Sequence, residues 1–178
     1  MTFCNYSSSK KSAHLHIRIS AHQMELTEEL QERIDLIKHK LKFIEQKPTV
    51  ACIEGLDPLM FWQDDELLNI AGGAAVPMLS PADWNTITQN DPDIMIVMLR
   101  GYTIEQSMKH IDHLLQLPGF VNLKAVKNNR LYIANGSKYF FDNPSENKVN
   151  SIELLAEIIN PKQFIFGYED EGWIKFSI

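Results

Sequence analysis

Aromatic and charged side chains gather where several short apolar runs of this sequence end. The candidates for contact with a bound molecule are Glu54, Trp62, Arg100, Tyr102, Tyr139 and Phe140. Aromatic rings offer apolar contact to a large flat molecule, and an arginine at the end of a buried strand can bind a carboxylate or phosphate. These residue types predict a site for a large flat molecule with a few polar groups on its rim. The alternative is that Trp62, Tyr139 and Phe140 pack a core or a partner.

Other kinds of chemistry find little support. The sequence has no Gly-x-Ser-x-Gly elbow and no phosphate-binding glycine loop, so we predict no enzyme. His110 and His113 are three residues apart and could reach one ion, but no third ligand of suitable spacing accompanies them. We therefore predict no metal site. The net charge of -6, without a compensating basic run, argues against nucleic-acid binding.

The elements that must position these residues alternate between helical and strand-like patterns. Residues 24–46 carry apolar side chains every three or four positions, which is typical of one face of a long amphipathic helix that ends before Pro48. Ser80 predicts a helix start, with Asp83 three residues after the cap. The other predicted elements are strands at 49–54, 94–99 and 131–134, and helices at 64–70, from Thr103 and at 145–159.

Alternation of strands and helices predicts a βαβ arrangement and a parallel sheet, with ligands met at the carboxyl ends of the strands. The fold class is therefore α/β: a three-layer lobe with a small, mainly parallel sheet flanked by helices and preceded by one long connecting helix. We expect an irregular N-terminal segment at 1–23 with a weak edge strand near 15–19, the connecting helix at 24–47, the lobe at 48–164 and a C-terminal tail at 165–178.

Short motifs in this order resemble a known family. They include Glu32-Arg-Ile-Asp35, Cys52-Ile-Glu-Gly-Leu-Asp-Pro58, Ile70-Ala-Gly-Gly73, Asp91-Pro-Asp-Ile94, Leu117-Pro-Gly-Phe120, Asn129-Arg-Leu-Tyr132 and Gly136-Ser-Lys-Tyr-Phe140. Residues from about 24 to 164 resemble the C-terminal half of ABC-importer solute-binding proteins of the metal-chelate class. That class includes cobalamin-, heme- and siderophore-binding proteins, and the likeness is greatest to the cobalamin-binding branch.

The resemblance implies a non-catalytic solute-binding module without its N-terminal lobe, and a ligand such as cobalamin or another metal chelate held between two lobes. It also implies docking on the membrane subunit of an ABC transporter through an exposed acid near Asp142 or Glu146, although a solvated surface acid is the plainer interpretation. As written, the chain has no secretory signal and is expected in the cytoplasm. A longer reading frame would make it periplasmic or lipid-anchored.

A protein–protein interaction module without ligand affinity is the alternative function. In this hypothesis the helix at 24–46 has an exposed apolar side, which makes a homodimer or binds a separately encoded first lobe.

Overall fold

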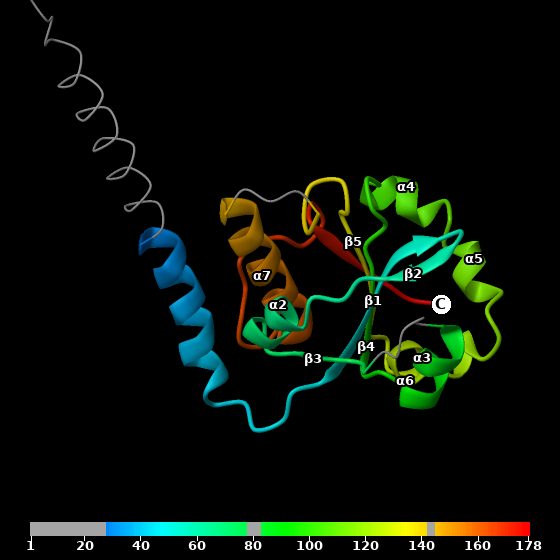
Figure 1. Cartoon of the computed structure of the whole chain (residues 1–178), viewed down its shortest axis with the longest axis horizontal. Helices are drawn as coiled ribbons and strands as arrows, with labels where there is room; N and C mark the ends of the chain where they lie inside the picture. Colours follow the sequence, from blue (N-terminus) through cyan, green and yellow to red (C-terminus); the bar gives the residue numbers. More distant parts are fainter. Residues whose placement is uncertain (1–27, 78–82, 142–144) are drawn as a thin grey trace, which may run out of the picture.

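A mixed β-sheet runs through the middle of the molecule, with helices on both faces (Figure 1). The computed structural model describes residues 28–77, 83–141 and 145–178. Within these residues the sheet has the order β2-β1-β4-β5-β6, and β3 pairs with β1. The strands are β1 (Thr49–Leu56), β2 (Leu59–Phe61), β3 (Ala74–Ala75), β4 (Ile94–Val97), β5 (Leu131–Ala134) and β6 (Trp173–Phe176).

The centre of the sheet is parallel. β4 pairs in parallel with both β1 and β5, and β3 pairs in parallel with the start of β1. β2 and β6 run antiparallel at the two edges. The carboxyl ends of β1, β4 and β5 therefore meet at one edge of the sheet, as the sequence predicts for an α/β lobe.

Side chains of the central strands alternate between two cores, as the pleat of a strand requires. In β4, Ile94 and Ile96 face one core while Met95 and Val97 face the other, and all four are fully buried. The first core packs against the helix at 28–41, α2 (Asp65–Ile70) and α7 (Ser145–Ile159). The lobe is thus three layers thick, and the predicted fold class is confirmed.

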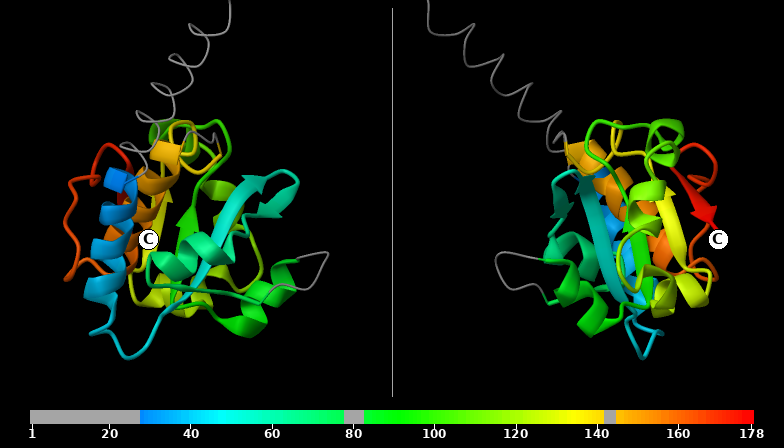
Figure 2. Two further views of the ribbon diagram at one scale, coloured as in Figure 1. Left: turned by 60° about the vertical axis from the view of Figure 1, so that its left-hand side comes forward. Right: turned by 90° about the vertical axis from the view of Figure 1, so that its right-hand side faces the viewer.

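The opposite face of the sheet is covered by short helices. These are α3 (Trp84–Asn90), α4 (Ile104–Met108), α5 (Asp112–Leu115), the 3-10 turn η1 (Phe120–Asn122) and α6 (Lys124–Lys127). Figure 2 shows the two helical layers on either side of the sheet. None of the helices in the described residues has the length and apolarity needed to cross a bilayer.

The helix at 28–41 lies alongside α7 (Figure 1). Its apolar side faces the lobe, because Ile37 is fully buried and Leu30 is buried. Arg33 fixes the contact by donating to both carboxylate oxygens of Glu153 on α7, at 2.8 and 2.7 Å. The expectation of an exposed apolar side on this helix is therefore wrong, and the interaction-module hypothesis loses the feature on which it rested.

Several predicted boundaries need correction. The first helix ends at residue 41 rather than 46, since a turn follows at residues 42 and 43. Asp83 is not the third residue of its helix but the N-cap of α3, where its carboxylate accepts from the Thr86 N–H. The expected cap Ser80 lies outside the described residues. The helix from Thr103 is divided into α4 and α5 by a turn of residues 109–111.

The ends of the chain differ from expectation in one respect. Residues 173–176, placed in a tail without pattern, form β6 and pair with β5 from Leu131↔Phe176 to Ala134↔Trp173. The irregular segment at 1–23 and its weak edge strand lie outside the described residues.

Candidate functional site

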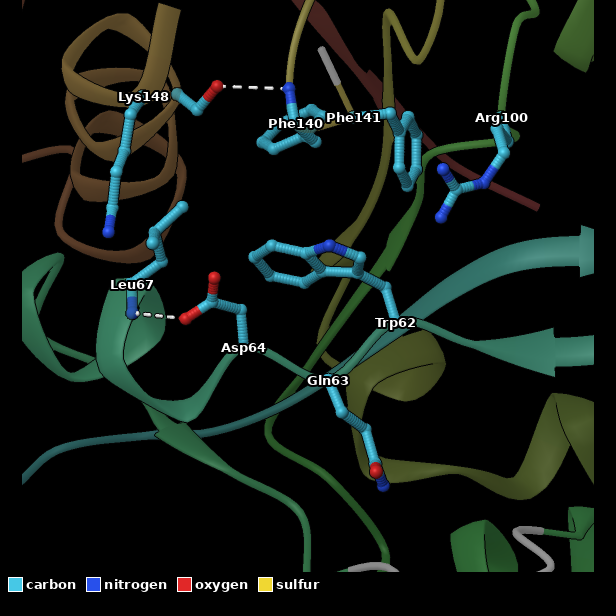
Figure 3. Close-up of a pocket in the computed structure, with 9 residues that line it drawn as sticks. Trp62, Gln63, Asp64, Leu67, Arg100, Phe140, Phe141 and Lys148 are labelled. Carbon is cyan, nitrogen blue, oxygen red and sulfur yellow. Dashed lines mark hydrogen bonds between the residues drawn. The ribbon is translucent and has the colours of Figure 1, made fainter. Parts of the chain in front are cut away.

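A pocket opens beside the carboxyl edge of the sheet, between the segment after β2, the loops after β4 and β5, and α7 (Figure 3). Its volume is about 280 Å³. The pocket is lined by Trp62, Gln63, Asp64, Leu67, Arg100, Phe140, Phe141, Lys148 and Ser151. Three of the six residues predicted to contact a ligand are therefore brought together here: Trp62, Arg100 and Phe140.

Aromatic rings form one wall of the pocket. The ring centroids of Trp62 and Phe140 are 5.9 Å apart with an edge-to-face angle of 65°, and Phe141 follows at 6.2 Å from Phe140. The backbone of Trp62 is fixed because its N–H donates to the carbonyl of Cys52 in β1 at 3.0 Å. Edge-to-face contacts of this kind hold the rings in place while their remaining surface faces the pocket.

Phe140 has an unusual backbone conformation, with φ of 76°. Residues other than glycine rarely adopt a positive φ, because their Cβ then crowds the backbone. The Phe140 N–H donates to the Ser151 hydroxyl of α7 at 3.0 Å, and that hydroxyl donates to the Asn147 carbonyl at 2.7 Å. α7 thus supplies the anchor that holds the Phe140 ring in the wall.

The charged groups lie on two sides of the pocket, with Arg100 on one side and Lys148 and Asp64 on the other (Figure 3). The Arg100 guanidinium donates to a carboxylate oxygen of Glu54 at 2.9 Å and lies over the Phe141 ring, 4.1 Å from the centroid. Lys148 lines the pocket from α7, and Asp64 lines it from the start of α2. One oxygen of Asp64 is engaged as the helix cap, accepting from the Leu67 N–H at 2.9 Å.

The other three predicted contact residues do not line this pocket, and of these Glu54 is connected to it only through its ion pair with Arg100. Tyr139 is 4% exposed and belongs to the core, where its ring stands perpendicular to that of Tyr168 at 5.8 Å. Tyr102 is exposed after β4 and packs edge-on against His110 at 5.4 Å. The packing alternative therefore describes Tyr139, while Trp62 and Phe140 lie at the border between core and pocket.

The predicted docking acids lie near the start of α7. Glu146 is exposed in its first turn, and Asp142 lies outside the described residues. Sequence reasoning did not name Lys148 and Ser151 as site residues. Both lie on α7 near the Phe140 loop, and only the packing of this helix across the sheet brings them to the pocket.

Within the part of the chain that the structure describes, the histidine pair is not part of a metal-binding cluster. The rings of His110 and His113 are 6.2 Å apart. Across residues 28–77, 83–141 and 145–178, no group of three or more His, Cys, Asp or Glu side chains is placed to hold a metal ion.

Solved structures identify the class of this fold. It is the α/β fold seen in periplasmic substrate-binding proteins of ABC transporters, at a level of sequence identity that defines the fold alone. No family model and no curated protein matches the sequence.

Three solved structures show the likeness in numbers. IsdE of S. aureus, complexed with heme, has a TM-score of 0.68 at 20% identity over 85% of this chain and 63% of its own. A periplasmic heme binding protein from Pseudomonas aeruginosa gives 0.65 at 17% identity over 86% and 57%. The TroA-like periplasmic binding protein FepB from Veillonella parvula gives 0.61 at 19% identity over 87% and 53%.

The matched region thus spans a little over half the length of these structures. Two of the three are described as periplasmic binding proteins, and the third is a complex with heme.

Proposed function

We propose that this chain is a non-catalytic solute-binding module that holds a metal chelate against the wall of Trp62, Phe140 and Phe141. The observation that carries the proposal is this aromatic wall with Arg100 beside it, at the carboxyl edge of the parallel strands. Ligands of open α/β sheets bind at this edge, and flat apolar rings suit an aromatic surface.

The ligand class is a flat macrocyclic chelate. A heme-like ligand is supported by the descriptions of two similar structures, the heme complex of IsdE and the heme binding protein of Pseudomonas aeruginosa. A cobalamin-like ligand is supported by the sequence resemblance. In either case the macrocycle would lie on Trp62 and Phe140, and a rim group would accept hydrogen bonds from Arg100.

The size of the pocket indicates how strongly it can bind. Its volume of about 280 Å³ lies just below the range of roughly 300–1,000 Å³ that is usual for ligand sites, which bury most of the ligand. These residues supply one wall, so we expect the described lobe to cover one side of a macrocycle and to bind weakly. A role of Glu146 in docking on a transporter subunit rests on the resemblance and on its exposed position.

Titration with hemin and with cyanocobalamin tests the proposal. We expect a saturable change in ligand absorbance at micromolar concentrations for at least one of the two. The Trp62→Ala substitution should weaken that binding about tenfold, because it removes the largest ring of the wall. Trp84→Phe is the matched control, since Trp84 packs against the opposite core. Absence of saturable binding by the unsubstituted chain would reject the proposed function.

A further inference from the structure

The ion pair between Glu54 and Arg100 is built into the end of the sheet. The Arg100 N–H donates to the Glu54 carbonyl at 3.0 Å, and the two side chains meet at 2.9 Å. The parallel register of β1 and β4, which pairs Ile53 with Val97, brings the residues that follow side by side. The pairing is therefore fixed by the backbone as well as by the side chains.

The two partners differ in their access to solvent. The side chain of Glu54 is 16% exposed, whereas that of Arg100 is 57% exposed. The acid is largely shielded from solvent and does not line the pocket, whereas the arginine does. An anion that enters the pocket therefore meets a guanidinium whose charge is already compensated by its ion pair with Glu54.

The remaining charges of the pocket also balance. Among the described residues, Arg100 and Lys148 line it with positive charge and Asp64 with negative charge, and Glu54 adds the second acid through its pair with Arg100. Two basic and two acidic groups leave no net formal charge. Such a site has hydrogen-bond donors in place but attracts anions weakly.

We infer that Glu54 sets the charge selectivity of this pocket, so that ligands with a neutral rim bind about as well as ligands with a carboxylate rim. The inference rests on the proposed function for its ligand class and adds the residue that controls selection within that class. In the free protein Glu54 forms an ion pair with Arg100. Without the negative charge of Glu54, the positive charge of Arg100 is no longer compensated and attracts carboxylates more strongly. A carboxylate bound to Arg100 would lie about 6 Å from that of Glu54, and one negative charge at this distance in a half-exposed site lowers the affinity for an anion by about tenfold.

A pair of ligands that differ only in rim charge tests the inference. Hemin carries two carboxylates, and its dimethyl ester carries none. We expect the unsubstituted chain to bind both within about threefold. Glu54→Gln should tighten hemin binding about tenfold and leave the ester unchanged. The gain should shrink as salt is added, because it is electrostatic.

The matched control is Glu171→Gln, which removes the same charge from the exposed Lys138–Glu171 ion pair outside the pocket lining. It should leave the ratio of the two affinities unchanged. An unaltered ratio in Glu54→Gln, or an equal change in Glu171→Gln, would overturn the inference.

A smaller pair of probes separates this inference from the proposed function. If neither hemin nor its ester binds, the heme-like ligand class is wrong, and 1-naphthoate and 1-naphthamide then report on the pocket at millimolar concentration. Both probes contain the same naphthalene ring system, but naphthoate carries a negative charge and naphthamide is neutral. A preference for naphthoate that appears only in Glu54→Gln supports the inference, whereas the same ratio in both proteins refutes it.

Discussion

Phe140 shows how one residue can serve both the core and the pocket. The residue is 8% exposed and its ring contacts Trp62 and Tyr139, yet it also lines the site. A positive φ at a residue with a Cβ costs about 1–2 kcal/mol, so the surrounding contacts must hold it. The hydroxyl of Ser151 is the contact that does so directly, because it accepts the Phe140 N–H.

Replacing Ser151 by alanine should therefore destabilise the protein. The Phe140 N–H would lose its partner in a buried position, which costs about 1–3 kcal/mol in the free energy of unfolding. Urea denaturation followed by circular dichroism measures the change, and hemin titration should show weaker binding as the Phe140 ring loses its anchor.

Ser107→Ala is the control for this substitution. Ser107 is also fully buried, but its hydroxyl finds no hydrogen-bond partner among the described residues. Its removal should change stability by less than about 0.5 kcal/mol. Equal losses in the two variants would show that the Ser151 hydrogen bond does not matter.

At the scale of elements, the helix at 28–41 is held on α7 by a polar cluster. Arg33 binds Glu153 through two nitrogen atoms and also donates to Asn150 at 2.7 Å. The Tyr168 hydroxyl donates to Glu153 at 2.9 Å, and burial followed by this hydrogen bond raises the pKa of Tyr168, which keeps it a neutral donor. The cluster joins the first helix, α7 and the chain before β6.

Arg33→Met should loosen this junction. It leaves the Glu153 carboxylate, whose side chain is 8% exposed, without its cation, and we expect a loss of about 2–3 kcal/mol in stability. The double variant with Glu153→Met should recover part of that loss, because no buried charge then remains unpaired. Hydrogen exchange of the helix at 28–41 reports the local effect.

Lys138→Met provides the comparison, since it breaks an exposed ion pair of Lys138 with Glu171. Exposed ion pairs contribute about 0–1 kcal/mol to the free energy of unfolding. If the Arg33 and Lys138 variants lose equal stability, the cluster does not hold the helix in place.

At the scale of the whole molecule, the parallel centre of the sheet could be predicted from the sequence. Continuous apolar runs such as 94–97 mark strands buried on both faces, and β5 and α7 have the predicted bounds. The edge strands β2 and β6 were not readable. β2 has three residues, and β6, which ends the strand order of the described residues, has a mixed burial pattern.

The part of the candidate site that lies at the ends of strands could be predicted from the sequence. Arg100 and Phe140 come together because the parallel strands β4 and β5 end at the same edge, whereas Trp62 follows the antiparallel strand β2, whose return along β1 brings it to the pocket. Tyr139 and Phe140 could not be told apart, since the positive φ that turns Phe140 toward the pocket has no glycine to reveal it. Lys148 reaches the site only through the packing of α7, which sequence spacing does not show.

Asp93 connects elements at the amino edge of the sheet, far along the strands from the pocket. Its carboxylate accepts from the N–H and hydroxyl of Thr49 in β1 at 2.9 and 3.0 Å, and it pairs with Lys124 of α6. Burial by itself would raise the pKa of Asp93, but the hydrogen bonds from Lys124 and Thr49 outweigh burial and hold the pKa below its ordinary value.

This lowered pKa makes global stability depend on pH in a defined direction. A carboxyl whose pKa is lower in the folded than in the unfolded chain contributes stability above the unfolded value of about 3.9, and that contribution is lost as the pH falls through the folded pKa. The free energy of unfolding should therefore drop as the pH is lowered from about 5 to below 4.

The Asp93→Asn variant should be less stable at pH 7, and its free energy of unfolding should fall less steeply over this pH range. Glu32→Gln, at an exposed acid of the first helix, should leave the slope unchanged. Urea denaturation at a series of pH values measures both slopes, and an unchanged slope in Asp93→Asn would show that this carboxylate does not link the strands.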